Sequence, residues 1–170
     1  MGAEASLTRA LEIYENVYGA SHPDLAQAVV NLASVQARQG DPASAEVSLT
    51  RALGIYENVY GPDHPALAHT LIRLGGVQRD RGDPDGAEIS QSRALMILEN
   101  VYGPDHAEVG RTLCNVGNVQ CLLSRLSDAR KSYTRAAVIL AARLGEQSPM
   151  TVLARQKLNE LDEAEGGDNA

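Results

Sequence analysis

The segment 49–61 reads LTRALGIYENVYG, and it decides the fold because it recurs at a fixed spacing. The segment 7–19 reads LTRALEIYENVYG, with Glu12 in place of Gly54 as its one difference, and 91–103 reads QSRALMILENVYG as a looser copy. Each copy begins 42 residues after the one before it. A period of this length is typical of a stacked array, in which each repeat packs against its neighbours rather than into one closed core.

Apolar residues in each repeat recur at spacings of three and four, which is the pattern of one helix face. In the first copy these residues are Leu7, Leu11, Tyr14 and Tyr18. All seven prolines fall at predicted helix boundaries, where proline is tolerated. We expect about eight antiparallel helices, over 3–18, from 23 to near 40, then 42–60, 65–81, 84–102, about 105–123, 129–144, and from 148 to about 161.

The junctions between helices carry a local signal of their own. Gly40-Asp41-Pro42 recurs as Gly82-Asp83-Pro84. Glycine can take the left-handed conformation that ends a helix, aspartate can cap the next helix, and proline suits its first turn. The third junction, 124–128, has neither glycine nor proline.

These elements predict an all-α array over residues 1–163. It comprises an unpaired helix over 3–18, helix pairs at about 22–61, 64–103 and 106–145, and a last helix over 148–163. Residues 164–170 are expected to form an acidic, frayed tail.

Small residues recur at three sites of the repeat, where they allow helix axes to approach to about 8–10 Å. The second and third sites lie twelve and nineteen residues after the first. The sites are occupied by Ala33, Gly75 and Gly117, by Ala45, Ala87 and Ala129, and by Ala52, Ala94 and Ala136.

The combination of Leu32-Ala33, Ala45 and Ala52 with the loop 60–65, YGPDHP, resembles the tetratricopeptide repeats of kinesin light chain and its bacterial relatives. The resemblance covers nearly the whole chain. It implies a right-handed superhelical solenoid, in which the first helix of each pair lines a concave groove that holds extended peptides. The chain departs from the family where a tyrosine is usual, three residues after the first small site, because Gln36, Gln78 and Gln120 stand there.

If the family layout holds, a set of polar residues on the three first helices lines this groove. Four of them are arginines and none is an acid, so the hypothesis is a groove for an extended acidic peptide, with amides binding its backbone and arginines its carboxylates. The alternative is that these arginines pair with Asp80 and neighbouring helices. The predicted groove residues are Gln27, Asn31, Ser34, Arg38, His69, Arg73, Arg79, Arg111, Asn115 and Asn118.

Charge and composition exclude several classes of partner. The formal charge is −7, but five of the 22 acids lie in 160–170, and the other 17 acids face 15 bases. A nearly neutral body lacks the basic footprint of a nucleic-acid-binding protein. No apolar run approaches the roughly 20 residues of a membrane span. Cys114 and Cys121 are too far apart on one helix for a disulfide, which favours a reducing, cytoplasmic setting.

The sequence offers no candidate for catalysis, for a metal site or for a cofactor. His22, His64 and His106 recur one repeat apart, so equivalent atoms would be roughly 20 Å apart and could not share an ion. Capping or packing at the loops explains these histidines better. No phosphate-binding glycine loop, nucleophile elbow or paired CxxC occurs, and the chain is not expected to be an enzyme.

Three functional interpretations remain. The leading one is a non-catalytic protein-interaction scaffold, as a fragment of a longer repeat protein. The second is the sensor or regulatory arm of a bacterial signalling ATPase whose NTP-binding module lies upstream. The third is self-assembly, because the apolar face of the unpaired first helix (Leu7, Leu11 and Tyr14) must be covered.

Overall fold

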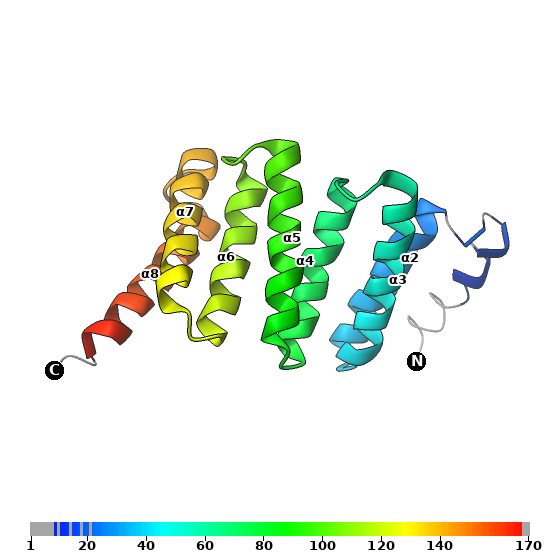
Figure 1. The fold of residues 1–170 in the computed structure, drawn as a ribbon, viewed down its shortest axis with the longest axis horizontal. Helices are drawn as coiled ribbons and strands as arrows, with labels where there is room; N and C mark the ends of the chain where they lie inside the picture. The colour runs from blue at the N-terminus through cyan, green and yellow to red at the C-terminus, as the bar shows by residue number, and fades with distance from the viewer. Residues whose placement is uncertain (1–8, 10, 14, 18, 21, 168–170) are drawn as a thin grey trace. The chain divides into compact units, whose positions relative to one another are not determined.

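The computed structural model describes residues 9, 11–13, 15–17, 19–20 and 22–167. In this part of the chain the regular secondary structure is entirely helical, with no strand (Figure 1). The described residues among 9–17 are helical. The helices that follow are α2 (Pro23–Arg38), α3 (Pro42–Tyr60), α4 (Pro65–Asp80), α5 (Pro84–Tyr102), α6 (Ala107–Leu122), α7 (Leu126–Leu144) and α8 (Pro149–Gly167).

The chain forms two compact units, residues 1–97 and 98–170, and the boundary falls within α5. In the first unit α3 packs against both α2 and α4. In the second unit α7 packs against both α6 and α8. Each unit is therefore built from successive helices that lie side by side, which is the local packing of a repeat array.

Most helix boundaries follow from local chemistry. The helices predicted over 42–60 and 84–102 have those bounds, and each begins at a proline. Asp41 caps α3 by accepting a hydrogen bond from the backbone N–H of Ser44 at 3.0 Å. Gly40 and Gly82 have φ angles of 82° and 79°, the left-handed conformation that ends a helix.

Two predicted boundaries differ from the structure by three residues or more, and the others from α2 onward agree within two. α7 begins at Leu126 rather than at residue 129, although its junction has neither glycine nor proline. The half-buried Leu126 packs against a core cluster formed by Ala129, Tyr133 and Leu161, so tertiary packing extends the helix.

The helix α8 also continues to Gly167, into the segment expected to be a frayed tail. Leu161 is buried in that same cluster, and Asp162 forms an ion pair with Arg130 of α7. These contacts hold the end of the helix against α7. Residues 168–170 lie outside the described part of the chain.

The nine small residues singled out in the sequence are all buried. A Cβ atom added at Gly75 would lie 2.7 Å from Nε2 of Gln91, and one added at Gly117 would lie 2.7 Å from Cε1 of Tyr133. At Gly117 only glycine leaves room for the facing tyrosine ring, whereas at Gly75 the flexible end of Gln91 would have to move.

The first helix has a partner inside the same chain. Leu11 is only 6% exposed, and Glu15 forms an ion pair with Arg51 of α3 at 2.9 Å. Leu7 and Tyr14, which complete the apolar face predicted for self-assembly, lie outside the described residues. At Leu11 no second chain is needed to cover that face.

Candidate peptide-binding site

The ten predicted groove residues lie on α2, α4 and α6. Seven belong to the first unit and three to the second, so each set is described within its own unit. The first set is Gln27, Asn31, Ser34 and Arg38 on α2 with His69, Arg73 and Arg79 on α4. The second set is Arg111, Asn115 and Asn118 on α6.

A pocket of about 430 Å³ opens in the first unit. It brings together three of the predicted residues, Ser34, Arg38 and Arg73, while Gln27, Asn31, His69 and Arg79 are outside its lining. The remaining lining residues come from α2, α3 and α4 and are Ala33, Ala37, Leu49, Gly76, Val77 and Asp80.

Ser34 joins the two arginines of the pocket. The Nη1 atom of Arg73 donates to the hydroxyl oxygen of Ser34 at 3.1 Å, and Nε of Arg38 donates to the backbone oxygen of Ser34 at 3.1 Å. The Ser34 hydroxyl in turn donates to the backbone oxygen of Val30 at 3.0 Å. Within the described chain neither arginine pairs with a carboxylate, so most of their N–H donors remain available.

The other two predicted arginines pair with acids of the chain, and Arg79 does so with the partner that the alternative interpretation named, whereas Arg111 pairs within its own helix. Arg79 forms an ion pair with Asp80 at 2.8 Å, and Arg111 forms one with Glu108. Asp80 also lines the pocket, and the sequence interpretation had considered it only as a partner of the arginines. Two of the four arginines thus form ion pairs with carboxylates of the described chain, and two do not.

Amide side chains of the predicted groove are held by tyrosines of the second helices. The Tyr56 hydroxyl donates to Oε1 of Gln27 at 3.3 Å, and Nε2 of Gln27 donates to Oδ1 of Asn31 at 3.3 Å. In the second unit the Tyr133 hydroxyl donates to Oδ1 of Asn118 at 2.7 Å.

His69 is exposed and Asn115 is half-buried. Neither side chain makes a hydrogen bond within the described residues. The structure therefore adds no contact that would assign these two residues a role in a site.

The glutamines that replace the tyrosine of the family have a structural role that the sequence interpretation missed. Each Oε1 accepts a hydrogen bond from a serine twelve residues later, on the paired helix, at 2.7–2.8 Å. The pairs are Gln36 with Ser48, Gln78 with Ser90 and Gln120 with Ser132. The constant spacing of glutamine and serine is the sequence signal that could have revealed them.

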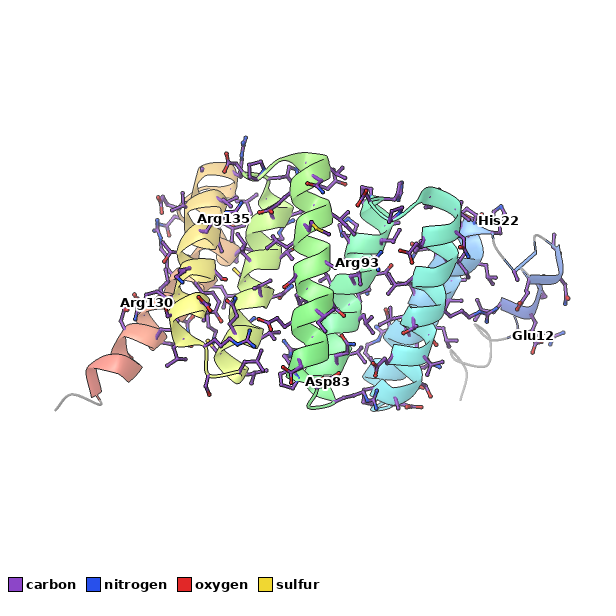
Figure 2. All side chains as sticks on the ribbon, viewed as in Figure 1. Glu12, His22, Asp83, Arg93, Arg130 and Arg135 are labelled. Atoms are coloured by element: carbon purple, nitrogen blue, oxygen red, sulfur yellow. The ribbon has the colours of Figure 1, made fainter. Side chains whose placement is uncertain are left out.

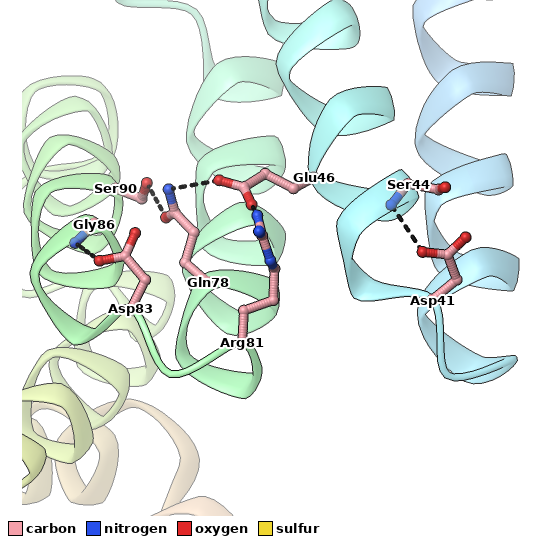
Figure 3. A network of polar contacts seen from close by, with 8 residues as sticks. All are labelled: Asp41, Ser44, Glu46, Gln78, Arg81, Asp83, Gly86 and Ser90. Carbon is pink, nitrogen blue, oxygen red and sulfur yellow. Dashed lines mark hydrogen bonds and ion pairs between the residues drawn. The ribbon is translucent and has the colours of Figure 1, made fainter.

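Figure 3 shows how one of these glutamines joins three helices. While Oε1 of Gln78 accepts from Ser90 of α5, its Nε2 donates to Glu46 of α3 at 3.5 Å. Glu46 also forms an ion pair with Arg81, just after α4. The network supports the packing of α4 between its neighbours, and its residues are outside the lining of the 430 Å³ pocket.

Ion pairs also recur at the period of the repeat. An arginine of one second helix pairs with a glutamate 36 residues earlier at 2.5–2.9 Å, as Arg51 with Glu15, Arg93 with Glu57 and Arg135 with Glu99. Arg93 and Arg135 are labelled in Figure 2. These pairs are partly exposed, so each contributes at most about 1 kcal/mol to stability.

The recurrent histidines are helix caps, as the sequence predicted. Nδ1 of His22, His64 and His106 accepts a hydrogen bond from the backbone N–H two residues later at 3.2 Å. The rings of His64 and His106 also lie against Tyr60 and Tyr102, with centroids 4.2 and 4.7 Å apart. Among the described residues no group of three or more histidine, cysteine or acidic side chains could hold a metal ion.

Both cysteines are free, and burial raises the pKa of the Cys114 thiol to about 11. That thiol stays protonated at neutral pH, so it is a poor nucleophile and a poor metal ligand. None of the helices in the described part of the chain is long and apolar enough to span a bilayer.

The chain matches the tetratricopeptide repeat family in sequence over residues 2–58, 28–97 and 77–142. No curated protein matches it. The structure is similar to BtubC (BKLC) from P. vanneervenii with a TM-score of 0.84 at 20% identity, over 96% of this chain and 65% of that one. This chain thus spans less than two thirds of the length of BtubC.

Two structures of a putative kinesin light chain with nearly identical TPR-like repeats, from Podosopora anserina, are also similar. Their TM-scores are 0.84 and 0.83 at 16% identity, over 97% of this chain and 78% of theirs. These similarities confirm the predicted all-α fold of antiparallel helix pairs, of the kinesin light chain-like type. Repeats of this kind generally form non-catalytic scaffolds for protein interactions. The chain therefore belongs to the tetratricopeptide repeat family.

Proposed function

We propose that this chain is a non-catalytic interaction module whose first unit binds an extended, acidic peptide. The observation that carries this proposal is the pair Arg38 and Arg73. They come from neighbouring first helices, they share Ser34, and within the described chain they have no carboxylate partner. A carboxylate of the ligand would supply that partner through charge-assisted hydrogen bonds.

The rest of the pocket supports binding of a peptide rather than of a free ion. Ala33, Ala37, Leu49 and Val77 provide an apolar lining beside the two guanidinium groups. Burial of an apolar ligand side chain on these residues would add to the affinity. The volume of about 430 Å³ lies in the range of small-molecule pockets and accommodates several side chains.

The hydrogen bonds to Ser34 lower the entropic cost of binding. Arginine side chains lose rotamer freedom when a ligand fixes them, and here part of that freedom is already lost before the ligand arrives. Asp80 restricts the ligand further, because its carboxylate would repel an acidic side chain placed beside it. The ligand carboxylate is therefore expected at Arg38 and Arg73, away from Asp80.

Fluorescence anisotropy with a labelled, C-terminally blocked probe of alternating glutamate and leucine tests the proposal. The wild type should bind this probe more tightly than a lysine–leucine probe of equal length. Arg73→Glu should weaken the binding of the acidic probe about tenfold or more, as expected for loss of a charge-assisted hydrogen bond.

Lys131→Glu is the matched control, because it makes the same change in charge at an exposed position of α7 in the second unit. It should leave the affinity within about twofold of the wild-type value, since an exposed charge outside the lining of the pocket is screened by salt. Equal affinity of wild type and Arg73→Glu for the acidic probe would contradict the proposal.

Two further parts of the sequence interpretation remain proposals. The free thiols of Cys114 and Cys121 favour a cytoplasmic location. The alternative function as the sensor arm of a signalling ATPase would place the same surface in a longer protein. An NTP-binding module encoded upstream in the same reading frame would support that alternative.

A further inference from the structure

Three of the four histidines of the chain cap helices through the same ring nitrogen. Nδ1 of His22, His64 and His106 accepts the backbone N–H two residues later at 3.2 Å, at the start of α2, α4 and α6. A ring nitrogen accepts a hydrogen bond only when it carries no proton. Each of these rings is therefore the neutral tautomer with its proton on Nε2, and each cap depends on that protonation state.

The helix itself also opposes protonation of the capping ring. The aligned peptide dipoles give the N-terminus of a helix a partial positive charge, which disfavours a cation there. An imidazolium at His64 would lose the bond from the N–H of Ala66 and would stand at the positive end of α4. The folded state thus favours the neutral ring, whereas the unfolded chain imposes no such preference.

The charged groups around His64 do not offset this cost. The ring forms no ion pair within the described chain, and the first turn of α4 contains no acid. From α3, the Tyr60 ring stacks on His64 with centroids 4.2 Å apart, a contact that either protonation state can make. Glu57, one turn before Tyr60, is engaged by Arg93 of α5. The adjacent Asp63 is exposed, so its charge is screened by solvent.

His22 has an acid beside it that attracts an imidazolium. Oδ2 of Asp24 lies 3.8 Å from Nδ1 of His22, so a protonated ring strengthens this ion pair as it loses the cap. In the register of the repeat, Asp24 corresponds to Ala66 in α4. The cap at His22 is therefore better protected against acid than the cap at His64.

His106 is an intermediate case, because charges of both signs surround it. Glu108 occupies the position of Asp24 in the first turn of α6, but Arg111 engages its carboxylate. From α7, Arg135 and Arg143 donate to backbone oxygens of the two residues before His106. The acid favours the imidazolium, while the arginines disfavour it.

We propose that His64 makes the start of α4 sensitive to pH, so that mild acid loosens its first turn while the first turn of α2 is better retained. Imidazole titrates between about pH 5 and 8. Because the unfolded chain binds the additional proton more readily, the cap contributes fully above this range, and stability is lost as the pH falls through it. Leu67 and Ala68 in that turn are fully buried, so the effect reaches the packing of α4. The inference does not depend on the proposed function.

The pH dependence of unfolding in His64→Asn tests the inference, because asparagine caps a helix without titrating. Urea unfolding is followed at about pH 7.5 and about pH 5. Over this range the unfolding equilibrium constant of the wild type should rise about fivefold more than that of His64→Asn, which corresponds to the loss of one cap of typical strength. His22→Asn should differ from the wild type by less, because Asp24 compensates at that cap.

His69→Asn is the matched control, since it is the same substitution at an exposed histidine of the same helix, whose side chain makes no hydrogen bond within the described residues. Its unfolding equilibrium constant should change with pH as that of the wild type does. Equal pH dependence of the wild type and His64→Asn would overturn the inference. A reduction of the pH dependence in His69→Asn as large as that in His64→Asn would overturn it as well.

A second measurement uses the wild type alone. The ¹⁵N chemical shifts of an imidazole distinguish a protonated nitrogen from an unprotonated one. At about pH 7.5 they should place the proton of His64 on Nε2, and the amide signal of Ala66 should shift as the ring titrates. A proton on Nδ1 of His64 at neutral pH would rule out the cap, and the inference with it.

Discussion

Gly117 and Tyr133 are matched in size across the α6–α7 packing, with 2.7 Å between a Cβ built on the glycine and Cε1 of the tyrosine. The equivalent residues are Gly75 and Gln91 one repeat earlier and Ala33 and Leu49 in the first repeat. In the two repeats whose facing residue is Tyr133 or Gln91, that residue extends over the first helix, and the small residue of the helix is glycine. In the first repeat the facing residue is Leu49, and the small residue is alanine. The size of the small residue therefore matches the residue that faces it in each repeat.

This match predicts opposite effects for two Gly→Ala variants. Gly117→Ala should lower the free energy of unfolding by roughly 1–2 kcal/mol, because overpacking against a buried ring exceeds the gain of about 1 kcal/mol from helix propensity. Gly76→Ala, where an added Cβ would have no neighbour within 4 Å, should raise it by about 0.5–1 kcal/mol. Urea unfolding followed by circular dichroism measures both. A destabilisation by Gly117→Ala that persists undiminished with Tyr133→Leu would argue against the size match.

At the third junction Ser124 has the positive φ angle that glycine has at the first two junctions. A substitution by glycine tests whether this residue is strained. Its φ of 58° is the one positive value outside glycine in the described chain, and it stands where the earlier junctions have Gly40 and Gly82. Relief of this strain should make Ser124→Gly more stable by about 1 kcal/mol. The control Ser127→Gly, within the first turn of α7, should lower stability instead. A loss of stability in Ser124→Gly, measured by thermal unfolding, would be inconsistent with strain at this residue.

The histidine caps can be separated from the stacking of their rings. His64→Ala removes both the cap on Ala66 and the contact with Tyr60, whereas His64→Asn restores an acceptor at the cap. His64→Ala should be less stable than His64→Asn by about 0.5–2 kcal/mol, the usual value of a cap. Equal unfolding midpoints for these two variants would show that the ring contact, and not the cap, stabilises the loop.

Removal of only one partner of the Gln78–Ser90 hydrogen bond should lower the free energy of unfolding. Ser90 is 5% exposed, so Gln78→Leu leaves its hydroxyl without a partner at a cost of about 1–3 kcal/mol. Adding Ser90→Ala should recover part of that loss, because the unpaired group is removed. If the second substitution instead lowers the unfolding midpoint further, the bond is not what stabilises this helix pair.

Local chemistry was sufficient for most of the fold. Asp41 and Pro42 fix the start of α3 by themselves, and the period assigns each small residue to a packing site. It was not sufficient at Leu126 and at the end of α8. There the helices are extended by packing around Leu161, which is 35 residues away from Leu126 in the sequence.

The candidate site shows the same limit. Helical periodicity placed Ser34 and Arg73 on corresponding faces, but their hydrogen bond joins residues 39 apart and depends on how α2 and α4 pack. Periodicity also could not tell that Arg79 would bind its neighbour Asp80 while Arg73 would not bind an acid. The choice between those partners depends on rotamers that the tertiary structure sets.

The most direct test of the central claim is a ¹H–¹⁵N NMR titration of the protein with the glutamate–leucine probe. The account predicts that the largest shift changes in the first unit fall on pocket residues such as Ser34, Arg38, Arg73 and Gly76. Binding that shifts only the outer residues of the second helices, such as Val47 and Ile89, and leaves the pocket unchanged would contradict it.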